Sequence, residues 1–281
     1  DGVQIGAKFL DGHRPSFIEP GLYFDDGKMR DEVYVWGSFL QSRMYEAGVR
    51  CSDCHDSHSL ELRREGNALC TGCHSAEVYA GKDHHGHDSA KAGGECISCH
   101  MPERTYMKVD ARRDHAFGSP MPRVSDALGS PSVCRTCHPS QGTEWAESGV
   151  QKWRTIRESR PRPQSHARWA SALVEGKRAR VDDGRWLDVA RDPGATALVR
   201  SSSWVRFSAE AAGAPDLASL ERLRDSSEGL DRLALVEVAR RLPAELQVEL
   251  LAPLLADSLR SVRLAEAEAL SAEPGLLRNP A

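Results

Sequence analysis

Apolar residues recur at helical spacing along the C-terminal part of the chain, where Ala, Leu, Arg and Glu are abundant. Such spacing places apolar side chains on one face of a helix. Proline and glycine interrupt the pattern, for example at Asp192-Pro193-Gly194 and at Pro243. We therefore expect helices near residues 166–179, 195–211, 216–226, 229–241, 244–256 and 260–271.

Two neighbouring stretches in this region, residues 250–257 and 262–267, resemble a HEAT-type repeat. In such repeats, stacked helix pairs bury apolar faces that one pair could not bury alone. The alternative is a plain small helical bundle.

Periodic stretches are short in the N-terminal part of the chain, which is rich in Gly, Pro, Ser and Asp. A helix is expected from Asp31 to Ala47, with Val35, Phe39 and Met44 on one face. Two prolines in residues 160–163 indicate a domain boundary. The predicted fold is mainly α. Residues 1–160 form a loop-rich domain with few helices and little sheet, and residues 161–281 form an α-helical, HEAT-like repeat domain.

The charge and hydropathy of the chain argue against two classes of partner. The formal net charge of −4 comes without the basic stripe that a nucleic-acid-binding protein needs. No apolar run approaches the length of a transmembrane segment. The first residues lack the charged and apolar regions of a signal peptide, so an exported chain would be present here in a mature or trimmed form.

All eight cysteines fall in C-x-x-C pairs, and a histidine directly follows each pair. In a C-x-x-C-H motif both thiols form thioethers with haem vinyl groups, and the histidine becomes the proximal iron ligand. No cysteine is left over for a disulfide. The sequence predicts four haem c groups, held by Cys51, Cys54 and His55; by Cys70, Cys73 and His74; by Cys96, Cys99 and His100; and by Cys134, Cys137 and His138.

Three other chemistries use cysteine pairs and fit this pattern less well. Zinc ribbons bind the metal directly through thiolates and need no histidine after every pair. Thioredoxin-like chemistry needs one motif at a strand–helix junction, whereas this chain has four in loop-rich sequence. Iron–sulfur clusters use other cysteine spacings.

The second axial ligand of each iron decides between electron transfer and catalysis, and seven further histidines are available for this role. His58 follows His55 too closely to reach round the same haem and is better placed to bind a neighbouring one. His84 and His87 could serve two different irons, and His115 completes the predicted distal set. The less favoured distal candidates are His85, His13 and His166.

Other residues near the motifs have weaker functional readings. Arg112 and Arg113 could pair with haem propionates, because a guanidinium matches a carboxylate, or they could be solvated. Methionine ligation of iron is a less favoured alternative. We expect four aromatic residues to pack on porphyrin faces or in small clusters: Tyr106, Phe117, Trp145 and Trp153.

Residues 31–42 lead into residues 48–59, and Cys96–Pro102, Tyr106-Met107 and Arg113-Asp114-His115 follow. Together these stretches resemble bacterial multihaem cytochromes of the cytochrome c554 and nitrite-reductase-like group, in the subset with HEAT or TPR repeats after the haem domain. The resemblance is specific over about residues 20–150 and looser over the helical tail. It implies an exported electron carrier with closely stacked, mostly bis-histidine haems. It places the family's paired histidines at residues 84–87, its post-motif histidine at His58 and its Arg-Asp-His element at His115.

Two departures from the family bear on function. Many members carry a further haem motif upstream of residues 21–24, and this chain has none there. The ammonia-forming nitrite reductases hold their catalytic haem through a motif that ends in lysine, whereas all four motifs here end in histidine. Nitrite reduction by that route is therefore not expected.

These observations predict an electron carrier, not an enzyme, with four haems acting as a wire and redox proteins as partners. The expected location is the periplasm or the cell exterior. Self-assembly into an oligomer or an extracellular cytochrome filament is a further hypothesis, in which His13 or His166 could donate a ligand between copies. One alternative is an oxidoreductase with one open haem site for a small nitrogen compound. Another is that the helical tail is a scaffold for a partner.

Overall fold

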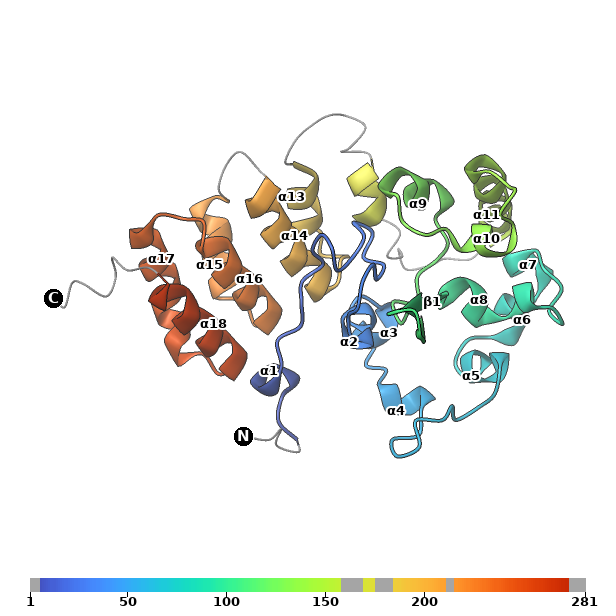
Figure 1. Cartoon of the computed structure of the whole chain (residues 1–281), viewed down its shortest axis with the longest axis horizontal. Helices are drawn as coiled ribbons and strands as arrows, with labels where there is room; N and C mark the ends of the chain where they lie inside the picture. The colour runs from blue at the N-terminus through green and yellow to red at the C-terminus, as the bar shows by residue number, and fades with distance from the viewer. Residues whose placement is uncertain (1–5, 158–168, 175–183, 211–214, 273–281) are drawn as a thin grey trace. The chain divides into compact units, whose positions relative to one another are not determined.

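The computed structural model describes residues 6–157, 169–174, 184–210 and 215–272. The chain forms two compact units. Residues 1–19 and 175–281 make the first, which we call the helical unit, and residues 20–174 make the second, the motif unit. Helices dominate both units, so the expected fold class, mainly α with little sheet, is confirmed (Figure 1).

The helical unit is built from short helices that pack on one another. Helix α14 packs on α13 and α16, and α16 also packs on α15 and α18. Proline ends α17 early, because Pro253 has no amide proton to donate, and the chain continues as the 3-10 helix η2. The elements are α1 (Phe9–Gly12), α13 (Gly184–Ala190), α14 (Ala197–Glu210), α15 (Leu217–Arg224), α16 (Gly229–Ala239), α17 (Ala244–Leu251), η2 (Ala252–Ala256) and α18 (Arg260–Ser271).

The expected helices match these elements from residue 195 onward, with small differences at their ends. Helix α13 was missed, because only Trp186, Leu187 and Val189 interrupt its polar sequence. The stretch expected near 166–179 is described only at residues 169–174, which are helical, and His166 lies outside the described residues.

Helix α16 is the centre of the helical unit. Leu233, Ala234, Leu235, Val236 and Val238 are all at most 1% exposed, so apolar side chains surround the helix. A helix that is apolar on every side is typical of a core position. The core of this unit is therefore made by its own side chains.

The N-terminal residues belong to the helical unit, which differs from the expected boundary at residues 160 and 161. The amide of Ile18 donates to Ser202 Oγ at 2.9 Å, and the amide of Arg260 donates to Asp11 Oδ1 at 3.0 Å. Ile18 is 2% exposed. A short segment with two anchoring polar contacts and one buried apolar side chain leaves no periodic pattern for sequence reasoning to detect.

The motif unit consists of one- or two-turn helices joined by loops, with one longer helix, α11. Its strands form an antiparallel hairpin, in which Glu103 pairs with Arg113 and Tyr106 with Asp110. Met107 and Lys108 have φ angles of 50° and 68°, as a tight hairpin turn requires. The elements are α2 (Val35–Phe39), α3 (Arg43–Glu46), α4 (Cys51–Cys54), α5 (Asn67–Thr71), α6 (Ala76–Tyr79), α7 (Lys82–His85), η1 (Ala92–Gly94), α8 (Cys96–His100), β1 (Glu103–Tyr106), β2 (Asp110–Arg113), α9 (Pro122–Leu128), α10 (Val133–Cys137) and α11 (Thr143–Arg157).

The helix expected over residues 31–47 is two short helices, α2 and α3. Ser42 has an extended backbone, and its side chain accepts a hydrogen bond from the Tyr45 amide, which begins α3. The buried Gln41 amide donates to the carbonyls of Gly27 and Gly37 at 3.1 and 3.2 Å. These contacts satisfy the chain at the break, so a continuous helix is not needed.

A buried polar cluster ties the loop after residue 24 to α9 in the motif unit. The Lys28 ammonium lies 2.7 Å from Asp26 Oδ2 and 2.7 Å from Ser125 Oγ, and it also donates to Ser130. Ser130 donates to the same Asp26 carboxylate. Trp169, on the helical residues 169–174, packs near this loop and is 5% exposed. The motif unit therefore extends to residue 174.

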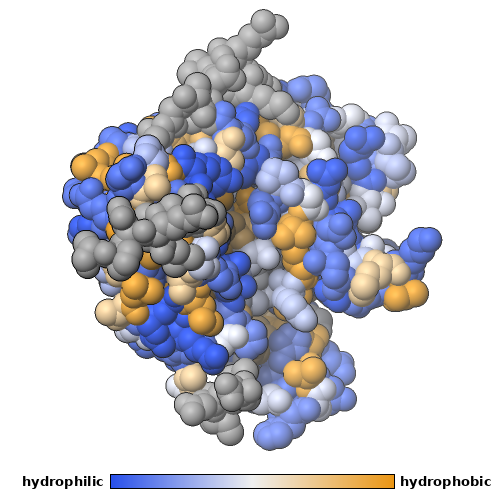
Figure 2. All heavy atoms as spheres, turned by 60° about the vertical axis from the view of Figure 1, so that its left-hand side comes forward, coloured by the Kyte–Doolittle hydropathy of each residue, from blue (hydrophilic) through white to orange (hydrophobic). Residues whose placement is uncertain are grey.

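None of the described helices combines the length and the apolar character needed to cross a membrane. On the face drawn in Figure 2, hydrophobic side chains form small separate groups among hydrophilic ones.

Glu266 of α18 is fully buried, and neither of its carboxylate oxygens has a hydrogen-bond partner among the described residues. Burial raises its pKa from 4.5 to about 7. The native state therefore keeps a proton that the unfolded chain loses at lower pH. The stability of the helical unit should fall as the pH rises from 4.5 to about 7 and stay low above that interval.

Glu266→Gln should raise the melting temperature by several degrees at about pH 8 and by much less at about pH 5, because the amide stays neutral at both values. Circular dichroism during thermal unfolding measures this difference. Glu268→Gln, at a more exposed position of the same helix, is the control and should change neither value. An equal gain at both pH values would contradict this account of Glu266.

Candidate haem-binding sites

Each C-x-x-C-H motif lies on a short helix: α4, α5, α8 or α10. Residues three apart on a helix share one side, so one turn presents both thiols in the same direction. The histidine amide donates to the carbonyl of the first cysteine in motifs one, two and four, at 2.8, 2.9 and 2.9 Å for His55, His74 and His138. The same local geometry is thus repeated along the chain.

Local hydrogen bonds fix where these helices begin. The Arg50 amide donates to Asp53 Oδ2 at 2.7 Å, which caps α4. The Asn67 side chain accepts from the Cys96 amide at 2.9 Å and donates to the Gly94 carbonyl at 2.9 Å. Asn67 therefore holds the second motif against the third.

Consecutive motifs lie side by side, in the order in which they occur along the chain. Helix α8 contacts both α5 and α10. Burial raises the pKa of the Cys70 and Cys99 thiols to about 11, and it also raises the pKa of Cys54. After burial, thiols of the next motif contribute to each shift: Cys73 for Cys54, Cys96 for Cys70, and Cys134 and Cys137 for Cys99.

Three motif histidines lie beside a histidine from outside the motifs. The ring centroids are 6.4 Å apart for His55 and His115, 6.0 Å for His100 and His84, and 6.1 Å for His138 and His87. The corresponding interplanar angles are 29°, 12° and 35°. Two imidazoles that bind one metal ion from opposite sides, each at about 2.0–2.1 Å, have ring centres roughly 6 Å apart. The three separations fit an iron between each pair.

Backbone carbonyls orient four of these rings through their Nδ1 atoms. The acceptors are the carbonyls of Leu60 for His55, Gly118 for His100, His85 for His87 and Arg113 for His115, at 2.9, 3.0, 2.5 and 2.9 Å. An Nδ1–H that donates to a carbonyl leaves Nε2 unprotonated and able to bind a metal. The residues present therefore fit the haem iron that the motifs imply.

The other histidines with predicted roles are not brought beside a motif histidine in this way. His58 is exposed, and its amide donates to Asp56 Oδ1 at 3.0 Å. His13 belongs to the helical unit, where its ring lies 4.9 Å from that of Phe9. His85 Nδ1 accepts from the His87 amide at 3.1 Å. The ligand roles of His58, His85, His13 and His166 stay predictions.

Aromatic side chains pack against the histidine rings, as expected for three of the four residues named from the sequence. Trp145 lies 4.8 Å from His138, Trp153 5.9 Å from His87 and Phe117 5.9 Å from His115. The fourth, Tyr106, instead donates to the Met29 carbonyl.

Tyr79 is a site residue that sequence reasoning missed. Its ring lies edge-on to His74 at 5.7 Å and to His84 at 5.2 Å, and so joins the second motif to the third. Its position five residues after a motif histidine was the only signal.

The two arginines of the hairpin have protein partners. Arg112 pairs with Glu32 and with Asp110, each at 2.6 Å, and Arg113 pairs with Glu103 at 3.4 Å. Among the described residues, no three His, Cys, Asp or Glu side chains form a cluster that could hold a metal ion directly. The eight thiols thus do not form the converging sets that a zinc ribbon requires.

Residues 45–78 match the family model of the doubled CXXCH motif. This stretch contains the first two motifs and part of each flanking loop. No curated protein and no solved structure matches the chain significantly. The chain therefore binds c-type haem through paired CXXCH motifs, at least two haems in number, and this implies a role in electron transfer.

Replacing both thiols of the second motif, by Cys70→Ala with Cys73→Ala, should lower the haem content by one per chain, because the thioether bonds cannot form. Pyridine haemochrome absorbance, divided by protein concentration, measures the ratio. Thr71→Ala, between the two cysteines, is the control and should leave the ratio unchanged. An unchanged ratio in the double variant would mean that haem is not attached there.

Proposed function

We propose that this protein is an electron carrier with four c-type haems, one at each C-x-x-C-H motif, and that adjacent haems act as a wire. The repeated helical geometry of the four motifs supports a common role for all of them. The side-by-side order of the motifs supports electron transfer along the series.

Three of the irons have two histidine ligands in this proposal: His55 with His115, His100 with His84, and His138 with His87. The observation that carries the proposal is the one-to-one match of these rings at 6.0–6.4 Å. It agrees with three of the four distal ligands expected from the sequence. His85 supports His87 through the contact of its Nδ1 with the His87 amide. For the fourth iron, held by His74, His58 remains the distal candidate.

Bound haem would supply a one-electron iron couple, whose potential depends on axial ligands, burial and nearby hydrogen bonds. The protein holds both ligands of an iron on fixed elements. Carbonyl acceptors at Nδ1 restrict ring rotation and raise the basicity of the ligand nitrogen. Trp145, Trp153 and Phe117 exclude water from the ring edges. These contacts keep the ligand set the same in both oxidation states.

The physiological setting is the finest part of the proposal. An exported location, in the periplasm or outside the cell, and redox proteins as partners follow from the expected class of cytochrome. Assembly into an extracellular filament, with the helical unit as a HEAT-like docking surface, extends the same idea. His13 and His166 remain the residues that could donate ligands between copies.

Removing one distal histidine tests the proposed ligand pairs. His84→Ala, His87→Ala and His115→Ala should each convert one haem in four from low-spin to high-spin, because the iron loses its sixth ligand. EPR of the oxidised protein and carbon monoxide binding by the reduced protein measure this change. His13→Ala is the control and should leave the monomeric protein unaltered. If all haems stay low-spin in the three variants, the pairing is wrong.

A second candidate function is an oxidoreductase with an open iron at the second motif. The observation that favours it is that the described ring contact of His74 is with Tyr79, not with a histidine from outside the motifs. His74 is also exposed. An exposed iron with one protein ligand could bind a small nitrogen compound.

Carbon monoxide titration of the unaltered reduced protein separates the two functions. Binding at about one haem in four, abolished in the Cys70→Ala, Cys73→Ala variant, would favour the oxidoreductase. No binding at any haem would favour a wire in which every iron has six ligands. His58→Ala should then create the binding, if His58 is the missing ligand.

A further inference from the structure

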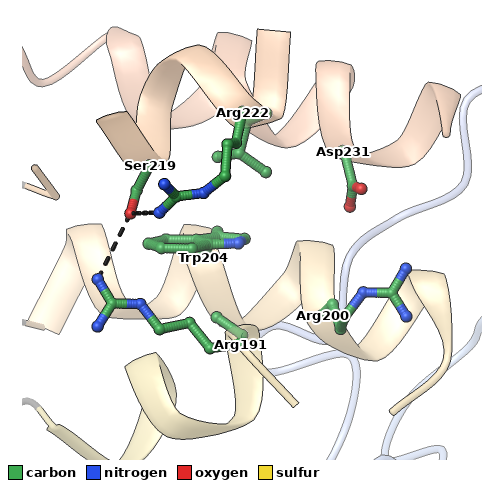
Figure 3. Close-up of a pocket in the computed structure, with 8 residues that line it drawn as sticks. Arg191, Arg200, Trp204, Ser219, Arg222 and Asp231 are labelled. Atoms are coloured by element: carbon green, nitrogen blue, oxygen red, sulfur yellow. Dashed lines mark hydrogen bonds between the residues drawn. The ribbon is translucent and has the colours of Figure 1, made fainter. Parts of the chain in front are cut away.

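The helical unit contains a cavity of about 240 Å³ that is independent of the haem motifs. It lies among helices α13, α14, α15 and α16 and is smaller than the roughly 300–1,000 Å³ of pockets for drug-sized ligands. Three arginines, one aspartate and one tryptophan dominate its wall (Figure 3). The lining residues are Ala190, Arg191, Arg200, Trp204, Ser219, Arg222, Leu223 and Asp231.

One arginine of the cavity is already paired. Arg191 Nη2 lies 2.9 Å from Asp216 Oδ2 and 3.4 Å from Ser219 Oγ. The hydrogen bonds from Ser219, followed by the charges of Arg191 and Arg222, lower the pKa of Asp216 below its usual range. This end of the cavity therefore already stabilises one carboxylate.

The other two arginines have no ion-pair partner among the residues that the structure describes. Arg222 Nη2 donates to Ser219 Oγ at 2.6 Å, and Arg200 Nη1 donates to the Ala195 carbonyl at 2.6 Å. Each guanidinium has five N–H donors, so most donors of both groups are left for a ligand.

The aspartate across the cavity does not neutralise these two charges. Asp231 accepts from Ser201 at 2.7 Å through Oδ1 and from Ser226 at 2.8 Å through Oδ2. Hydroxyl donors therefore hold both of its oxygens in place. The three arginines outnumber Asp216 and Asp231, so the cavity keeps an excess of positive charge and favours an anion.

The indole of Trp204 gives the cavity an apolar surface beside these charges. Figure 3 shows the indole between the side chains of Arg191 and Arg222, and Trp204 is 6% exposed. Leu223 and Ala190, each 5% exposed, add apolar area to the wall. An organic ligand would use this area, whereas an inorganic anion would leave it in contact with water.

From these observations we infer that the cavity binds a small organic carboxylate, held by Arg222 and Arg200 with its carbon skeleton against Trp204. Arginine suits this role because its planar group donates two parallel hydrogen bonds to a carboxylate. The inference does not depend on the number or the ligands of the haems.

Isothermal titration calorimetry of the full-length, haem-loaded protein tests this inference, with benzoate, succinate and inorganic phosphate as probes. We expect at least one carboxylate to bind with one site per chain and more tightly than phosphate. Arg222→Ala and Arg200→Ala should each weaken that binding about tenfold or more, the loss of one charge-assisted hydrogen-bond pair.

The control is Arg224→Ala, on the same helix as Arg222, whose side chain pairs with Asp225 and does not line the cavity. It removes the same charge and should leave the affinity unchanged. Arg222→Lys keeps the charge without the fork and should bind with intermediate affinity. Circular dichroism checks that each variant is folded. No binding of either carboxylate, tighter binding of phosphate, or equal weakening by Arg224→Ala would overturn the inference.

Discussion

The motif unit depends on one local constraint, the single helical turn that presents two thiols and an imidazole together. It occurs four times, on α4, α5, α8 and α10. Much of the remaining chain in this unit orients these turns, as Asn67 does between the second and the third. Few large apolar side chains of the unit are buried, mainly Met29, Phe39, Leu40 and Trp169 among the described residues. We infer that covalently held haem supplies much of the core that the side chains do not.

The helical unit follows a different physical principle, because its core is complete without a prosthetic group. The fully apolar surround of α16 and the short packed helices give it the stability of an ordinary helical domain. Its costs lie in its buried polar groups. Arg232 is paired with Asp257, whereas Glu266 has no partner among the described residues. Stability that varies with pH therefore originates in this unit.

Sequence reasoning succeeded where the signal was local. The four motifs need only five consecutive residues each, and the helices after residue 195 follow from spacing and from Gly and Pro breaks. It was incomplete where distant residues decide the structure. The break after Leu40 depends on the contact of Gln41 with Gly27, and the placement of residues 6–19 depends on Ile18 and Asp11. The role of Tyr79 likewise depends on how two motifs meet.

The spatial order of the motifs limits how electrons could pass through the protein. The third motif has a neighbour on each side, through α5 and α10, and the second is held between the first and the third. The first and fourth motifs each have one such neighbour. Cys51 and Cys137, at these ends, are exposed, whereas Cys96 and Cys99 are half-buried. A partner would therefore reach the series most directly at the first or the fourth haem. Tyr79, between His74 and His84, lies at the step that every electron crossing the whole series would have to make.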